Sequence, residues 1–182
     1  MDLPKVFIGS SLEALDLAKA LQSQLQYDTT PTVWDQDVFA PSEFPLESLL
    51  KQIRTSDFAV FVFKPDDITR MRNSTHPVVR DNVIFESGLF MGGLGRNHCF
   101  ILTPRGADLH LPSDYWGWIP LDYNPDRPDN NLEAAVGPAC SKIVRRIKEV
   151  HSSNRGLQAK VKAELPRLYE ELQKALNKPS GI

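Results

Sequence analysis

The chain has 182 residues, of which 41% are hydrophobic and 24% charged, and its formal net charge is -2. This balance is typical of a soluble globular domain with a short addition, and it excludes a strongly basic surface for nucleic acid and a long acidic tail. No signal peptide is visible, and no apolar run approaches the ~18 residues of a membrane span. Cys99 and Cys140 have no metal-ligand spacing and make no disulfide framework. We therefore expect a cytoplasmic protein that binds no membrane, nucleic acid polymer or metal.

Apolar runs and segments of helical periodicity alternate along the first 150 residues. The run at residues 57–63 is continuous, as in a central strand that is buried on both faces. The expected strands are residues 5–8, 32–34, 57–63, 98–102 and 118–123. The expected helices lie within residues 12–25, 46–53, 80–96 and 131–150. This alternation predicts an α/β fold, a five-stranded parallel sheet with helices on both faces in a flavodoxin-like order.

Polar residues mark the expected helix starts and the loops between elements. Ser10 and Glu13 have the spacing of a capping box, which predicts Ser10 as an N-cap. Asp81 or Asn82 is expected to cap the helix of residues 80–96. Residues 68–79 are rich in Arg, Asn, Ser and Pro and are predicted to form a loop.

The C-terminal stretch differs in pattern from the rest of the chain. HSSNRG at residues 151–156 predicts a break, and apolar residues at three- and four-residue steps follow it through residue 176. We expect a domain at residues 1–150 and a helical extension at residues 151–182. The extension would dock on its own domain, connect to another domain or pair between subunits.

Glu86 is the one charge between Asp81 and Arg96 in the segment RDNVIFESGLFMGGLGR, residues 80–96. Burial of an unpaired carboxylate is unfavourable, so such a group finds a partner or shifts its pKa. An ion pair with Arg80, a wetted position at the lip of a pocket and a functional role would each explain it.

The expected strand ends also place polar residues where open parallel sheets bind ligands. Asn82 and Glu86 lie four residues apart and therefore share a helix face. The strand ends add GSS at residues 9–11, Trp34 with Asp35, and KPDD at residues 64–67. Each residue also has a structural explanation that involves no ligand. Ser10 would cap a helix, Trp34 would belong to the core, and Asp66 would be an ordinary turn residue. The glycines after Glu86 form no dinucleotide fingerprint, because they do not open a helix after a strand.

The segments KVFIGSS, VWDQDVF, DFAVFVFKPDD, RDNVIFESGLFMGGLGR and LPSDYWGW occur in this order. Over residues 4–150 they resemble the TIR-like domain of bacterial anti-phage effectors. That family includes TIR domains fused to STING-type or SAVED-type cyclic-oligonucleotide sensors and the TIR effectors of cyclic-pyrimidine systems. The resemblance implies a TIR fold that hydrolyses NAD+ when assembled, with NAD+ as substrate and no further cofactor.

The resemblance also implies roles for individual residues and partners. Glu86 occupies the position of the family's catalytic glutamate, and Arg80 and Asn82 match the same motif. The other substrate-binding candidates are Ser10, Ser11, Trp34, Asp35 and Asp66. The expected partners are NAD+, further copies through TIR–TIR contacts, and a cyclic-oligonucleotide sensor in cis or in trans.

One carboxylate would be enough for this reaction, because nicotinamide leaves NAD+ as a neutral molecule and needs no general acid. Glu86 would stabilise positive charge on the ribose, Trp34 would stack on a ring, and the amides at Ser10 and Ser11 would meet the pyrophosphate. The apolar loop at residues 37–47 would gate the site and mediate contacts between copies, or only pack over the sheet edge. A deoxyribosyltransferase-like enzyme and a non-catalytic TIR scaffold remain alternatives.

Overall fold

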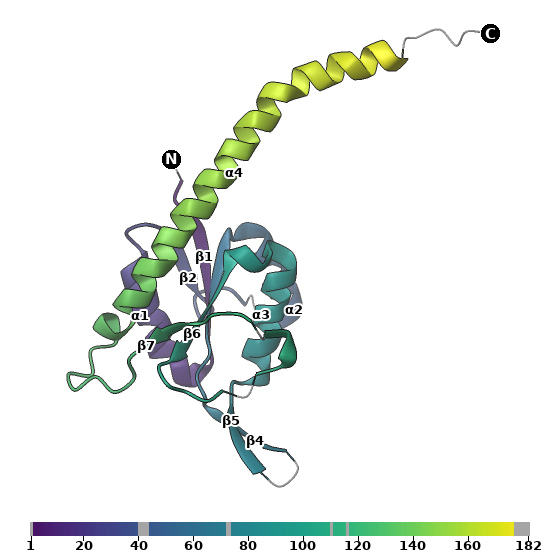
Figure 1. The fold of residues 1–182 in the computed structure, drawn as a ribbon. Helices are drawn as coiled ribbons and strands as arrows, with labels where there is room; N and C mark the ends of the chain where they lie inside the picture. Colours follow the sequence, from purple (N-terminus) through teal and green to yellow (C-terminus); the bar gives the residue numbers. More distant parts are fainter. Residues whose placement is uncertain (1, 40–43, 72–73, 110, 116, 177–182) are drawn as a thin grey trace. The chain divides into compact units, whose positions relative to one another are not determined.

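The computed structural model describes residues 2–39, 44–71, 74–109, 111–115 and 117–176. The chain divides into two compact units, Met1–Ile147 and Lys148–Ile182. The first unit contains both sheets (Figure 1).

Five parallel strands form the central sheet in the order β2-β1-β3-β6-β7. They are β1 (Lys5–Gly9), β2 (Thr30–Val33), β3 (Phe58–Val62), β6 (Cys99–Pro104) and β7 (Leu121–Tyr123). β3 occupies the centre, and all five of its residues are buried, as its apolar run predicts. The predicted flavodoxin-like parallel sheet is therefore confirmed.

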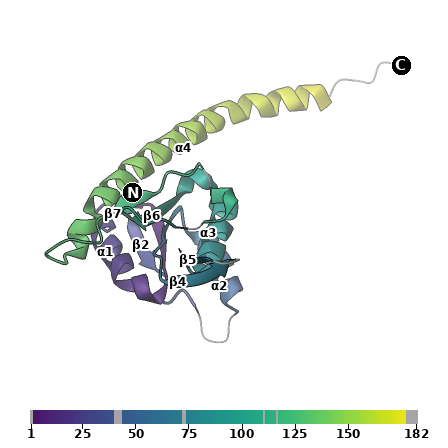
Figure 2. The same cartoon turned by 60° about the horizontal axis from the view of Figure 1, so that its bottom comes forward.

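Helices cover both faces of this sheet (Figures 1 and 2). α1 and the first part of α4 lie on one face, and α2 and α3 lie on the other. The helices are α1 (Leu15–Leu25), α2 (Pro45–Thr55), α3 (Asp81–Leu94) and α4 (Leu132–Leu176). Short 3₁₀ turns are η1 (Leu12–Ala14), η2 (Arg96–His98) and η3 (Ser113–Tyr115).

Aromatic rings hold α3 against the sheet. The ring of Phe90 on α3 stacks on Phe7 of β1 at 4.5 Å between centroids and meets the edge of Phe61 of β3 at 5.5 Å. Gly9 ends β1 beside the same rings, and a Cβ there would lie 2.5 Å from Cε1 of Phe61. This packing fixes the helix that carries Glu86 relative to the carboxyl end of β1.

Two elements differ from the sequence-based predictions. The predicted loop at residues 68–79 is mostly an antiparallel hairpin of β4 (Asp67–Met71) and β5 (Ser74–Val78). Its backbone pairs with itself, so it needs no apolar strand pattern. α4 continues through residues 151–156, so the predicted break is wrong: isolated Gly and Ser residues lower helix propensity without ending a helix.

Candidate active site

A pocket of about 670 Å³ opens where β1 and β2 end and α3 begins. Its size falls in the range of small-molecule sites. It brings together six of the eight predicted site residues. The lining comprises Ser10, Ser11, Leu12, Trp34, Phe39, Pro45, Leu46, Leu49, Arg80, Asn82, Val83, Phe85 and Glu86.

Glu86 is the unusual acid of this pocket. Desolvation by burial raises the pKa of its carboxyl from 4.5 to about 7, and no neighbouring charge contributes to the shift. Within the described residues its carboxylate has no hydrogen bond or ion pair. Of the three explanations that the sequence allowed for Glu86, the ion pair with Arg80 is not formed; Nη2 of Arg80 lies 2.7 Å from Oε1 of Glu13 instead. A desolvated carboxylate without a partner is available to a ligand.

The turn after β1 forms another part of the pocket wall. Nε1 of Trp34 donates to Oγ of Ser10 at 2.9 Å, and this Oγ donates to the Ser11 carbonyl at 2.9 Å. The Ser11 hydroxyl donates to Oδ2 of Asp66. Ser10 is therefore not a helix cap: Ser11 occupies the N-cap position of η1, and it makes no capping bond through its side chain. These bonds hold the Trp34 ring and the turn together.

Two predicted residues do not line the pocket. Asp35 forms an ion pair with Lys19, with Nζ and Oδ2 3.3 Å apart. Asp66 lies behind Ser11, and its second oxygen, Oδ1, is buried without a hydrogen-bond partner in the described part of the chain. The order of residues along a strand end did not show which side chain faces the pocket.

A second layer supports the helix turn that bears Glu86. Tyr115 from η3 donates to the Ile84 carbonyl at 3.0 Å, and its hydroxyl lies 2.7 Å from Oγ of Ser87. Ser87 donates to the same carbonyl at 2.8 Å. Arg80, rather than Asp81 or Asn82, occupies the N-cap position of α3, and its side chain forms no capping bond. Tertiary contacts, not a cap, thus anchor this turn.

The sequence predicted the apolar loop at residues 37–47 beside the site, but not the apolar lining that η1 and the helices contribute. Leu12 and Phe85 are 67% and 58% exposed, although side chains of these types are usually buried. The loop at residues 37–47 does border the pocket, through Phe39 and Pro45. Residues 40–43 of this loop lie outside the described residues. Unusual exposure of large apolar side chains is a structural signal that the sequence pattern does not carry.

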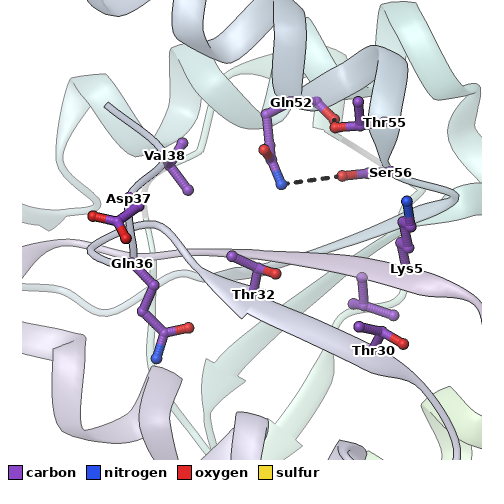
Figure 3. A pocket seen from close by; sticks show the side chains of 10 residues that line it. Lys5, Thr30, Thr32, Gln36, Asp37, Val38, Gln52, Thr55 and Ser56 are labelled. Atoms are coloured by element: carbon purple, nitrogen blue, oxygen red, sulfur yellow. Dashed lines mark hydrogen bonds between the residues drawn. The ribbon is translucent and has the colours of Figure 1, made fainter. Parts of the chain in front are cut away.

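A smaller hollow of about 260 Å³ lies between β2, the end of α2 and the residues after β2 (Figure 3). Hydroxyl and amide side chains dominate its wall, and at the end of α2 Nε2 of Gln52 donates to Oγ of Ser56 at 3.5 Å. It contains none of the predicted site residues. Glu86, the acid with the large pKa shift, lies only in the larger pocket.

The described residues contain no group of three or more His, Cys, Asp or Glu side chains arranged to hold a metal ion. No helix among them combines the length and the apolar character needed to cross a membrane.

Comparison with known proteins identifies the family. Residues 5–125 match the TIR domain of the CAP12/Pycsar effector proteins. This chain belongs to that TIR-domain family. Over 139 residues it is 43% identical to the Pycsar effector protein PaPycTIR of Pseudomonas aeruginosa, covering 76% of this chain and 45% of that protein.

Two other relatives of this TIR domain are named Pycsar effector protein and CD-NTase-associated protein 12. The chain is 41% identical over 144 residues to the Pycsar effector protein BcPycTIR of Burkholderia cepacia, covering 79% of this chain and 47% of the relative. It is 39% identical over 113 residues to CD-NTase-associated protein 12 of Flavobacterium daejeonense, covering 62% and 36% of the two chains. The chain thus spans about half the length of the curated relatives it matches, or less.

Proposed function

We propose that this TIR domain is an NAD+ nucleosidase that cleaves the bond between nicotinamide and ribose as part of an anti-phage effector. The single observation that carries the proposal is Glu86: a carboxylate without a partner in a pocket large enough for part of a dinucleotide. Membership of the CAP12/Pycsar TIR family supports the setting, because the relatives are named as effectors and CD-NTase-associated proteins. NAD+ is the substrate in this proposal, with no further cofactor.

The chemistry needs one fixed negative charge. When the C–N bond breaks, its electron pair goes to the nicotinamide nitrogen, which leaves as a neutral molecule. Positive charge grows on the ribose, and water then adds to the anomeric carbon and loses a proton. An ionised Glu86 stabilises the developing charge, and the apolar lining strengthens this interaction by excluding water.

The cationic substrate itself favours the ionised form of Glu86. Desolvation raises the pKa of the carboxyl to about 7, so it is substantially protonated at neutral pH. A nicotinamide cation within a few ångströms lowers this pKa and makes the carboxylate the dominant form. Substrate binding and the activation of Glu86 are therefore coupled.

Other lining residues bind and orient the substrate in this proposal. Asn82 lies one turn before Glu86 on α3 and offers an amide to a sugar or to the nicotinamide carboxamide. The indole of Trp34, held by its hydrogen bond to Ser10, offers a surface on which a base or nicotinamide can stack. Arg80 stands at the rim, where its ion pair with the exposed Glu13 can exchange for a phosphate.

Assembly would regulate this site. Phe39 and Pro45 line the pocket and flank residues 40–43, so a neighbouring copy that contacts this loop would change the pocket. Several apolar side chains near the pocket are exposed, including Phe44 at 75%. We therefore propose activation by TIR–TIR contacts, which a cyclic-oligonucleotide sensor in cis or in trans would bring about.

The test offers the concentrated protein NAD+ and, separately, 2′-deoxynucleosides, and measures nicotinamide and free base by chromatography. We expect nicotinamide release that Glu86→Gln abolishes and that Glu164→Gln, an exposed change in α4, leaves intact. Cleavage of the deoxynucleosides but not of NAD+ would indicate a deoxyribosyltransferase-like enzyme. Clustered protein that consumes neither substrate, while Glu86→Gln retains effector function, would indicate a scaffold.

A further inference from the structure

The hydrogen bonds in the turn after β1 determine whether its side chains donate to a ligand or accept from it, which we call the polarity of the turn. Ser10 and Ser11 are only 6% and 7% exposed, and both line the pocket. A serine hydroxyl has one proton to donate and two lone pairs to accept with. The partners of these two buried hydroxyls therefore determine what each can still offer to a ligand.

Ser10 has one free acceptor position. Its proton is directed to the Ser11 carbonyl at 2.9 Å, and one lone pair accepts the indole N–H of Trp34 at 2.9 Å. The Ser11 carbonyl also accepts the backbone N–H of Ala14 at 3.2 Å, so a ligand that took the Ser10 proton would cost this carbonyl one of its two hydrogen bonds. While this hydrogen bond is kept, Oγ of Ser10 offers the pocket its second lone pair.

Ser11 is oriented by a charged partner. Its hydroxyl donates to Oδ2 of Asp66, and a hydrogen bond to an ionised carboxylate is stronger than one between neutral groups. Oδ1 of Asp66 is buried and has no hydrogen-bond partner in the described part of the chain. Among the described side chains, the Ser11 hydroxyl is therefore the hydrogen-bond donor on which this carboxylate depends. Oγ of Ser11 then presents only lone pairs to the pocket.

Neither Arg80 nor Lys64 bonds to these two hydroxyls. Nη2 of Arg80 bonds to the Glu13 carboxylate at 2.7 Å, and Nζ of Lys64 bonds to the Glu13 carbonyl at 2.9 Å. The two serines, Ser11 with Asp66 as its partner, therefore line the same pocket as Glu86. A phosphate oxygen has no proton to donate, whereas each hydroxyl of a ribose has one.

We propose that Ser10 and Ser11 form a subsite that accepts a hydrogen bond from a sugar hydroxyl of the substrate and disfavours its phosphates, with Asp66 as the positioning residue that sets this polarity through Ser11. The inference rests on the proposed function and deepens it, because it assigns the turn after β1 to a ribose instead of the pyrophosphate expected from the sequence. Asp66 acts without lining the pocket.

The experiment measures binding by calorimetry in a Glu86→Gln background, which prevents turnover, with NAD+ and inorganic pyrophosphate as separate probes. Ser11→Ala should weaken NAD+ binding roughly 3- to 10-fold, the effect of one hydrogen bond, without weakening pyrophosphate binding. Asp66→Ala frees the Ser11 proton and should strengthen pyrophosphate binding by a similar factor. If Asp66→Ala does not fold, Asp66→Asn tests the same point, because its amide can donate to Ser11.

The double variant separates this effect from the loss of a negative charge. In Ser11→Ala/Asp66→Ala the gain in pyrophosphate affinity, measured against Ser11→Ala, should be smaller than the gain from Asp66→Ala alone. An equal gain, or weaker pyrophosphate binding in Ser11→Ala, would overturn the proposed polarity. Unchanged melting temperatures would show that the fold is intact.

Wild-type turnover distinguishes this inference from the proposed function. Nicotinamide release with an NAD+ affinity that does not depend on Ser11 would overturn the inference alone. NAD+ binding that depends on Ser11 without nicotinamide release would overturn the proposed function alone. If the protein binds no NAD+, both are wrong.

Discussion

At the scale of single residues, Glu86 shows a conflict between stability and the proposed function. The folded protein holds its carboxyl at a pKa of about 7 by desolvation, against 4.5 for a solvated glutamate. The folded state therefore binds this proton more tightly than the unfolded state does. The favourable contribution of this group is complete below about pH 4.5 and is lost as the pH rises through 7.

Glu86→Gln should therefore stabilise the fold only at high pH. At pH 8 the variant avoids a desolvated charge, and we expect a gain in unfolding free energy of about 1–2 kcal/mol once partial solvent exposure is allowed for. At pH 4.5 the protonated glutamate resembles glutamine, and the two proteins should be equally stable. Urea titrations at both pH values measure the difference.

Glu47→Gln is the matched control for this change. Glu47 lies exposed in the first turn of α2, where its charge favours the helix. Its substitution should not stabilise the protein at either pH. A loss of stability in Glu86→Gln at pH 8 would mean that the carboxylate makes a favourable interaction in the folded state.

At the scale of elements, contacts made by Tyr115 and Ser87 position α3. Tyr115→Phe removes the hydroxyl that meets the Ile84 carbonyl and Ser87, so we expect a loss of about 1 kcal/mol in unfolding free energy. Amide exchange should also become faster in the turn that bears Glu86. Tyr27→Phe is the control, since Tyr27 is 81% exposed, and it should change neither quantity. Identical behaviour of the two variants would show that Tyr115 does not hold this turn.

Two adjacent glycines of α3 test its packing against α2. A Cβ at Gly93 would lie 2.4 Å from Cγ2 of Ile53, whereas a Cβ at Gly92 meets nothing within 4 Å. Gly92→Ala should stabilise the protein by about 0.5–1 kcal/mol through helix propensity. Gly93→Ala should destabilise it by about 1 kcal/mol, because the strain of overpacking exceeds that gain. Thermal unfolding of both variants checks the prediction, and equal stabilisation would mean that α2 and α3 are not packed this closely.

The sequence predicts elements best where burial sets the pattern. β3 could be predicted as a buried central strand because apolar residues are needed on both of its faces. The β4–β5 hairpin was missed because its strands pair with each other and need no apolar run. The continuity of α4 was missed because local composition lowers helix propensity without preventing a helix.

The same limit applies to the site. Helical spacing correctly placed Asn82 and Glu86 on one pocket wall, and strand ends brought in Ser10, Ser11 and Trp34. The ion pair of Asp35 with Lys19 and the position of Asp66 behind Ser11 depend on side-chain directions. Both residues come after the last residue of a strand, where side chains no longer alternate regularly between faces, so spacing alone could not separate lining residues from supporting ones.

At the scale of the whole molecule, the chain spans about half the length of its curated relatives, or less. If assembly activates the site, nicotinamide release per molecule should rise with protein concentration. A fusion that clusters the chain on addition of a dimerising ligand should raise it further at constant concentration. The same fusion with Glu86→Gln is the control. A rate per molecule that does not depend on concentration or clustering would contradict activation by assembly.

The most direct test of the account is the pH profile of kcat/KM for nicotinamide release by the clustered protein, beside Glu86→Gln. Because kcat/KM reports the free protein, we expect it to rise with pH through about 7, the pKa of the Glu86 carboxyl, and the variant to be inactive at every pH. Activity retained in Glu86→Gln, or a profile flat across pH 6–8, would contradict the claim that this desolvated carboxylate is the catalytic group.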